Sequence, residues 1–234
     1  MALPKINDIP NYELTIPSTK KIIKFRPFLV KEQKILLMAL ETQDQRQILD
    51  AVLDTMRSCI IEDINLNSLT TFDVEYIFTK IRTKAVGETS KIGLACTQCE
   101  ETTEIEINLD SISLNTSDID KKVVLNDQYT VMLKYPTYND ITESEIKSET
   151  ATEQLYGSLI ACLDKLLTEE EQIEFSEQSR KDIEEFLESL TSDQIQKIMN
   201  FTTSIPSLKY EGEFTCDHCN THNEFKLQGI QDFF

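Results

Sequence analysis

"FTCDHCNTHNEFKL", residues 214–227, contains two cysteines three positions apart, followed by the alternating apolar pattern of a β-strand. "LACTQCEETTEIEI", residues 94–107, has the same layout. When the two stretches are aligned, the cysteine pair of one falls on the cysteine pair of the other. In both, a glutamate stands five residues after the second cysteine, and apolar residues follow it at alternate positions. The sequence therefore contains a short repeat of a cysteine knuckle on a strand hairpin.

Two Cys-x-x-Cys turns can together supply the four sulfur ligands of a tetrahedral zinc site. The 116 residues between the two pairs exceed the usual spacing of zinc ligands, so the matched flanks support the prediction better than the spacing does. We expect a structural site, because four thiolates fill the zinc shell and leave no position for a reacting water. The predicted ligands of this split zinc ribbon are Cys96, Cys99, Cys216 and Cys219.

Other interpretations of the cysteines stay open at this point. A Cys-x-x-Cys can be a redox dithiol, although the flanking strands lack the βαβ pattern of such enzymes. Disulfides need an oxidising compartment, and the opening "MALPKINDIP" has no signal-peptide character. His218 or His222 could replace a cysteine ligand, but His218 lies between the two cysteines of its own turn. The solitary Cys59 and Cys162 lie in apolar helical patterns typical of buried thiols.

The 234-residue chain has the composition of a soluble globular protein, with 40% apolar and 27% charged residues. Its net charge of −18 is uneven: residues 1–99 carry 13 basic and 12 acidic side chains, whereas residues 100–234 carry 10 and 29. The stretch 140–200 alone has 5 basic and 16 acidic residues. Such a surface repels nucleic-acid phosphates and can steer a basic protein partner. The longest apolar run, "ILLMAL" (35–40), is too short to cross a bilayer, so we expect an intracellular protein.

Apolar periodicity predicts the other elements. A strand pair is expected at 12–17 and 20–28, and a hairpin with an Asn-Asp turn at 121–136. Expected helices, several of them opening on a capping residue, are 30–42, 44–60, 70–87, 137–147, 151–167, 179–190 and 191–205.

Together these elements predict an α+β fold that is mostly helical, with short antiparallel hairpins and a split, zinc-ribbon-like pair of four-cysteine knuckles joining the regions near 96–99 and 216–219. Its expected parts are a strand pair with three helices, a split zinc-ribbon module, and an inserted hairpin with an acidic helical lobe; they span 1–92, 93–109 with 205–234, and 110–204. A metal that joined the two ends of the insertion would offset the closure entropy of this long loop.

No motif of a known active site is found. The five glycines form no phosphate-binding loop or dinucleotide fingerprint, and no G-x-S-x-G elbow is present. Both histidines stand beside the second cysteine pair, which leaves none for an independent triad. The abundant carboxylates lie in patterns of solvated helix faces. The sequence therefore predicts a protein that is not an enzyme.

One stretch resembles a known family. "IPSTKKIIKFRPFLVKEQKILLMALETQD" (16–44) is similar to the N-terminal region of the baseplate hub assembly proteins of T-even-type contractile-tailed bacteriophages. The core of the resemblance is the strand "IIKFRPF" leading directly into "VKEQKILLMALE". The later order of three helices, a cysteine knuckle, an acidic helical region and "SLKYEGEFTCDHC" extends the resemblance over most of the chain.

The resemblance implies a non-enzymatic role in building the baseplate hub by protein–protein contact, in the cytoplasm of an infected bacterium. The implied partners are other hub and tail assembly proteins, with no nucleic acid and no membrane span. Retention in the finished virion and release as a chaperone both stay open. Two functions of other classes are kept beside it: a zinc-ribbon adaptor for nucleic acid or protein, and a Cys-x-x-Cys thiol–disulfide enzyme.

Overall fold

A computed structural model describes residues 9–114, 119–145 and 150–228 of the chain. The chain divides into two compact units. The first comprises residues 1–66, 72–115 and 207–234, and the second comprises 67–71 and 116–206. Among the described residues, none of the helices combines the length and the apolar character that a membrane crossing requires.

The N-terminal part begins with the predicted strand pair and then forms helices. Strands β1 (Tyr12–Thr15) and β2 (Ile22–Phe25) are antiparallel. The helices that follow are α1 (Val30–Glu41), α2 (Gln45–Cys59) and α3 (Thr71–Val86), with a 3₁₀ turn η1 (Leu66–Ser68) before α3. They confirm the helices predicted at 30–42, 44–60 and 70–87.

Local sequence explains the ends of these helices. The Asp44 carboxylate accepts hydrogen bonds from the backbone N–H groups of Arg46 and Gln47, so it caps α2. Gly87 follows the last residue of α3 with a φ of +124°, a conformation that favours glycine. Its N–H donates to the Thr83 carbonyl and closes the helix.

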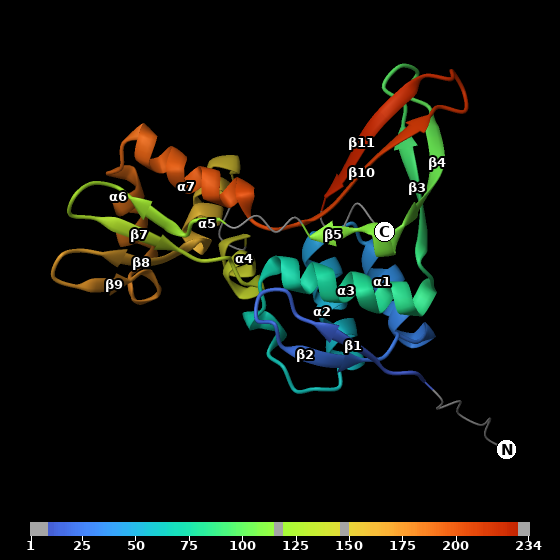
Figure 1. Ribbon diagram of the computed structural model, residues 1–234, viewed down its shortest axis with the longest axis horizontal. Helices are drawn as coiled ribbons and strands as arrows, with labels where there is room; N and C mark the ends of the chain where they lie inside the picture. The colour runs from blue at the N-terminus through green and yellow to red at the C-terminus, as the bar shows by residue number, and fades with distance from the viewer. Residues whose placement is uncertain (1–8, 115–118, 146–149, 229–234) are drawn as a thin grey trace. The chain divides into compact units, whose positions relative to one another are not determined.

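Two antiparallel hairpins in the first unit carry the predicted cysteine pairs. One is formed by β3 (Thr89–Ala95) and β4 (Thr102–Asn108), the other by β10 (Leu208–Thr215) and β11 (His222–Gln228). We call them the paired hairpins, and they run side by side (Figure 1). A 3₁₀ turn η2 (Leu109–Ser111) and the short strand β5 (Ser113–Leu114) follow β4, and β5 pairs with the start of β10.

The registers of the paired hairpins are the same. Ile92 pairs with Ile105 in the first, and Gly212 pairs with Phe225 in the second, each position shifted by 120. A side chain at Gly212 would meet the Phe225 ring, because a Cβ there would lie 2.8 Å from its Cζ atom. The sequence repeat is therefore also a structural repeat.

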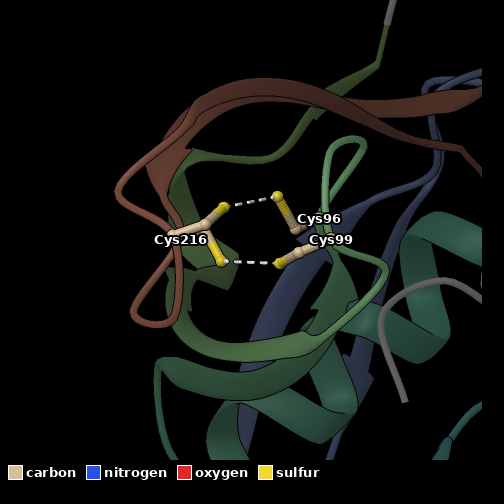
Figure 2. Close-up of side chains that lie close together, drawn as sticks. Cys96, Cys99 and Cys216 are labelled. Atoms are coloured by element: carbon tan, nitrogen blue, oxygen red, sulfur yellow. Dashed lines mark hydrogen bonds between the residues drawn. The ribbon is translucent and has the colours of Figure 1, made fainter.

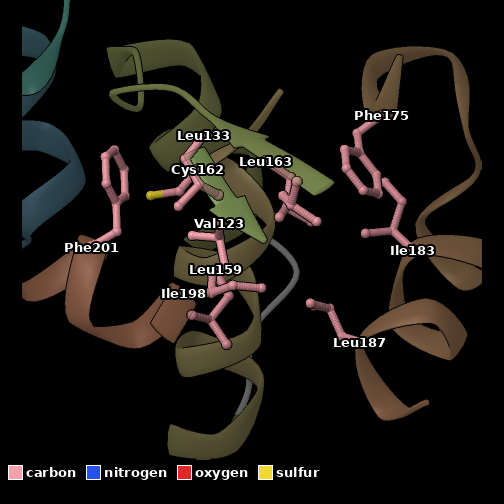
Figure 3. Close-up of a cluster of buried hydrophobic side chains, with 11 residues drawn as sticks. Val123, Leu133, Leu159, Cys162, Leu163, Phe175, Ile183, Leu187, Ile198 and Phe201 are labelled. Atoms are coloured by element: carbon pink, nitrogen blue, oxygen red, sulfur yellow. The ribbon is translucent and has the colours of Figure 1, made fainter. Parts of the chain in front are cut away.

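The second unit combines a sheet with four helices. Its sheet has the order β6 (Lys122–Val124), β7 (Thr130–Leu133), β8 (Leu163–Leu167) and β9 (Gln172–Glu174), all antiparallel. The helical elements are α4 (Tyr138–Glu145), α5 (Ala151–Ala161), a 3₁₀ turn η3 (Phe175–Glu177), α6 (Arg180–Glu188) and α7 (Ser192–Ser204). Eleven buried side chains form the core, among them Leu159, Ile198 and Val131 (Figure 3).

The helix predicted at 151–167 is wrong in its second half. Helix α5 ends at Ala161, and the next five residues after Cys162 form β8 between β7 and β9. Leu155, Leu159 and Leu163 have helical spacing, but "LDKLL" is too short for periodicity alone to separate helix from strand. Pairing with neighbouring strands decides the outcome, because the Cys162 carbonyl already accepts from the N–H of Lys134 just beyond β7.

The predicted description as mostly helical is also wrong. The chain is 43% helical and 27% strand, with four small antiparallel sheets. The error comes from the acidic region, where the hairpin of β8 and β9 was assigned to helix and loop. Because these strands complete a sheet with β6 and β7, the second unit is a mixed α+β core instead of a helical lobe.

Candidate metal centre

Each cysteine pair lies on a tight turn at the tip of one hairpin. In the first turn the N–H of Cys96 donates to the Glu101 carbonyl at 2.9 Å, and the N–H of Glu100 donates to the Cys96 carbonyl at 3.0 Å. The second turn makes the same two bonds with Cys216, Thr221 and Asn220. Glu100 and Asn220, at matching positions, both have a positive φ, of 62° and 56°. The backbone thus directs both sulfurs of each turn to one side.

The two turns bring all four predicted sulfurs into one cluster. The Sγ atoms of Cys96 and Cys219 lie 3.6 Å apart, and so do those of Cys99 and Cys216. All four sulfurs are within 4.8 Å of one another, and Figure 2 shows the sulfurs of the labelled cysteines pointing toward a common centre. With zinc–sulfur bonds of about 2.3 Å, a tetrahedral site has sulfurs about 3.8 Å apart, whereas a disulfide bond is about 2.05 Å long. The observed spacing therefore fits a tetrahedral metal site and not a disulfide.

The first cysteine of each pair is the more protected one. Cys96 and Cys216 are 2% and 0% exposed, while Cys99 is half-buried and Cys219 is exposed. The Cys96 sulfur accepts a hydrogen bond from the Gln98 N–H at 3.4 Å, and the Cys216 sulfur accepts one from the His218 N–H at the same distance. Such N–H···S bonds stabilise a thiolate, which is the form that binds a metal.

The environment separates the acidities of the sulfurs. Backbone N–H groups of Gln98 and Cys99 lower the pKa of Cys96 to about 6. The N–H of Glu101 lowers the pKa of Cys99, but burial and hydrogen bonds to other thiols outweigh it and raise that pKa to about 12. Backbone N–H groups also lower the pKa of Cys216. Without a cation, then, the cluster does not hold four thiolates equally well, because like charges close together oppose ionisation.

Two buried polar side chains link the turns across the cluster. Asn223, on β11, accepts hydrogen bonds through Oδ1 from the N–H and the hydroxyl of Thr97, at 3.0 and 2.7 Å. Thr103, on β4, accepts through Oγ1 from the N–H of Asp217 at 3.2 Å. The sequence interpretation missed both residues. The available signal was their common place in the repeat, seven residues after the first cysteine of each copy.

Comparison with known families identifies the chain's class. Residues 9–234 match the family model described as "T4 bacteriophage base plate protein". The chain belongs to this family. This result confirms the predicted resemblance to a T-even-type baseplate protein. No curated protein and no solved structure matches the chain.

Neither histidine of this baseplate protein joins the sulfur cluster. His218 is exposed and contributes its backbone N–H to Cys216. The His222 ring lies 3.2 Å from the Glu213 carboxylate on the neighbouring strand. Among the described residues, the group that could hold a metal consists of the four cysteines.

The two solitary cysteines of the baseplate protein are buried, as predicted from their helical patterns. Burial raises the pKa of Cys59 to about 11 and that of Cys162 to about 12. Both thiols therefore stay protonated at neutral pH and act as small apolar side chains.

Proposed function

We propose that this protein is a non-enzymatic assembly protein of the phage baseplate hub that acts by protein–protein contact and is stapled by structural zinc. The family match over residues 9–234 carries the baseplate part of the proposal. A baseplate protein interacts with other baseplate proteins during assembly in the infected host and in the virion. The hub, the assembly role and the zinc are the proposed refinements.

The zinc proposal is supported by the donor set and its spacing. Four sulfurs 3.6 to 4.8 Å apart fit a closed tetrahedral shell, which has no open position for catalysis. Both ends of the chain segment between the paired hairpins also meet in the first unit, where Ser113 and Leu114 of β5 pair with β10. In this proposal zinc joins the regions 93–109 and 205–234 into one module, and the acidic part 110–204 is an insertion into it.

A role in protein contact is supported by helix α1, whose apolar residues face away from its own unit. Val30, Leu37 and Met38 are 79%, 54% and 58% exposed. The buried side chains of α1 are Glu32 and Ala39, and Glu32 forms an ion pair with Arg26 at 2.9 Å. A helix with apolar residues on its exposed face is typical of a surface that a partner covers.

Helix α2 gives a useful contrast to α1. Its apolar residues Val52, Leu53 and Met56 are all buried, at 3%, 5% and 0% exposed, as in an ordinary amphipathic helix. The apolar surface of α1 is therefore a property of that helix and not of the whole helical region. This contrast is a second support for a contact role.

Co-expression with the other baseplate proteins of the same phage tests the proposal. We expect the chain to co-purify with at least one hub protein, and the double variant Leu37→Glu/Met38→Glu to lose that complex while keeping its fold. Ser58→Glu, at an exposed position of α2, is the matched control and should keep the complex. Failure of the wild-type chain to bind any hub protein would refute the assembly role.

A thiol–disulfide activity is the second candidate, because the pKa of Cys96 is lowered to about 6 within a Cys-x-x-Cys pair. Access argues against it, since Cys96 is 2% exposed and a substrate disulfide must reach the nucleophile. Alkylation of the metal-free protein at pH 6.5 separates the two roles. Rapid and selective modification of Cys96 would favour the enzyme, and protection of Cys96 would favour the structural site.

A further inference from the structure

The polar side chains between the two cysteine turns form a reciprocal arrangement. Asn223 reaches from the second hairpin to the first turn, where it binds Thr97. Thr103 reaches from the first hairpin to the second turn, where it binds the Asp217 N–H. Thr97 and Asp217 occupy equivalent positions of the repeat, and so do Thr103 and Asn223, each pair 120 residues apart. The same cross-hairpin bond is therefore made twice, once in each direction.

Each of these side chains also contacts a buried sulfur on the opposite hairpin. The Asn223 amide Nδ2 donates to the Cys96 sulfur at 3.6 Å. The Thr103 hydroxyl hydrogen-bonds Cys216. Asn223 is only 3% exposed and Thr103 only 4%, so water does not readily replace either one.

We propose that Asn223 and Thr103 are positioning residues, which dock the paired hairpins and set the four sulfurs at tetrahedral spacing before a metal binds. This inference rests on the proposed metal site, but it concerns the protein groups that assemble it. Outer hydrogen-bond partners orient metal ligands, and their loss commonly weakens metal binding by about 10- to 100-fold. The apolar core cannot do this work alone, because the side chains buried beside the sulfurs include these two polar ones.

Backbone amide exchange in the metal-free full-length protein provides the first test. Asn223→Ala should speed exchange of the Thr97 N–H about tenfold or more, and should leave the Asp217 N–H less affected. Thr103→Val, which removes the hydroxyl at nearly constant volume, should have the opposite selectivity. Thr102→Val is the matched control, because Thr102 is the exposed neighbour of Thr103 on β4.

Cobalt(II) titration of the same variants provides the second test. We expect Asn223→Ala and Thr103→Val to weaken cobalt binding about 10- to 100-fold and to shift the sulfur-to-cobalt charge-transfer band, because each removes a hydrogen bond to a ligand sulfur. Asn223→Thr should retain most of the affinity, since threonine performs the equivalent task at position 103. Thr102→Val should bind like the wild type.

The two tests distinguish the positioning role from the metal site itself. If wild-type protein binds no cobalt or zinc while the amide pattern holds, the metal proposal fails and the docking role stands. If wild-type protein binds metal but neither variant changes its affinity or its amide exchange, the positioning role is refuted. If Asn223→Thr behaves like Asn223→Ala, the equivalence of the two positions is refuted with it.

Discussion

The second unit and the tips of the paired hairpins are held together by different means. The second unit buries eleven apolar side chains around its sheet, with Val131 and Ile198 fully buried (Figure 3). The paired hairpins bury six apolar residues at the end distant from the turns. Beside the turns, the buried groups are mostly sulfurs and polar side chains, with Phe214 the apolar exception. A hairpin pair with so little apolar packing at its tips needs another source of stability, and metal ligation is the source that its residues offer.

Removal of one sulfur should have the largest effect, and only on the hairpins. Cys96→Ser and Cys216→Ser should each abolish metal binding and lose much of a ligation energy on the order of 10 kcal/mol. The double variant should be little worse than either single one, because one missing ligand already opens the site. Amide exchange should rise in β3, β4, β10 and β11 and stay unchanged in β7 and β8. Full stability and one bound zinc in either single variant would show that the ligand set is wrong.

A cavity in the second unit should have the opposite distribution. Leu159→Ala removes a side chain that is 1% exposed, and it should destabilise that unit by about 2–5 kcal/mol. Metal affinity should not change, because the sulfur cluster lies in the first unit. Leu155→Ala is the control on the same helix: Leu155 is 44% exposed, so its loss should cost less than about 1 kcal/mol. Urea unfolding monitored by amide exchange would measure both effects.

The stability of the first unit should decrease as the pH rises toward 7. Burial raises the pKa of Glu75 to about 7 from its ordinary 4.5, although the Leu208 N–H donates to its carboxylate at 3.4 Å. The folded state therefore favours the protonated acid, and this stability is complete below pH 4.5 and is lost as the pH rises through 7. The loss is roughly 3 kcal/mol at about 1.36 kcal/mol per pKa unit.

Glu75→Gln tests this pH dependence because it is neutral at every pH. The variant should gain stability relative to wild type between about pH 5 and pH 8, whereas Glu106→Gln, at an exposed position, should not. A difference between wild type and Glu75→Gln that is constant over this range would contradict the assignment. The second unit should show no such dependence on residue 75.

The smallest expected effect distinguishes the two turns from each other. Glu100 has a φ of 62°, which is unfavourable for a residue with a long side chain, so Glu100→Gly should stabilise its turn by about 0.5–1 kcal/mol. Asn220→Gly should change stability by only a few tenths of a kcal/mol, since asparagine tolerates a positive φ well. Chemical unfolding of the metal-free protein would compare them. A larger gain at position 220 than at 100 would refute the argument from backbone strain.

The sequence predicted features that depend on local chemistry. The capping residues Asp44 and Thr191 marked the starts of α2 and α7, and the cysteine repeat marked the turns whose sulfurs meet. Residues 163–167 were assigned to a helix because the sheet pairing that makes them a strand involves residues distant along the chain. Asn223 and Thr103 were missed for a related reason. Their partners lie across the cluster, so only the alignment of the two repeat copies could have indicated them.

The metal site that joins the two repeat copies can be tested by X-ray absorption at the zinc edge of the purified protein, together with its zinc content. We predict one zinc per chain with four sulfur neighbours at about 2.3 Å, and no stoichiometric zinc in Cys96→Ser or in Cys216→Ser. A protein without zinc, a shell that contains nitrogen or oxygen ligands, or zinc retained when either cysteine pair is broken would contradict a four-sulfur site shared by the two hairpins.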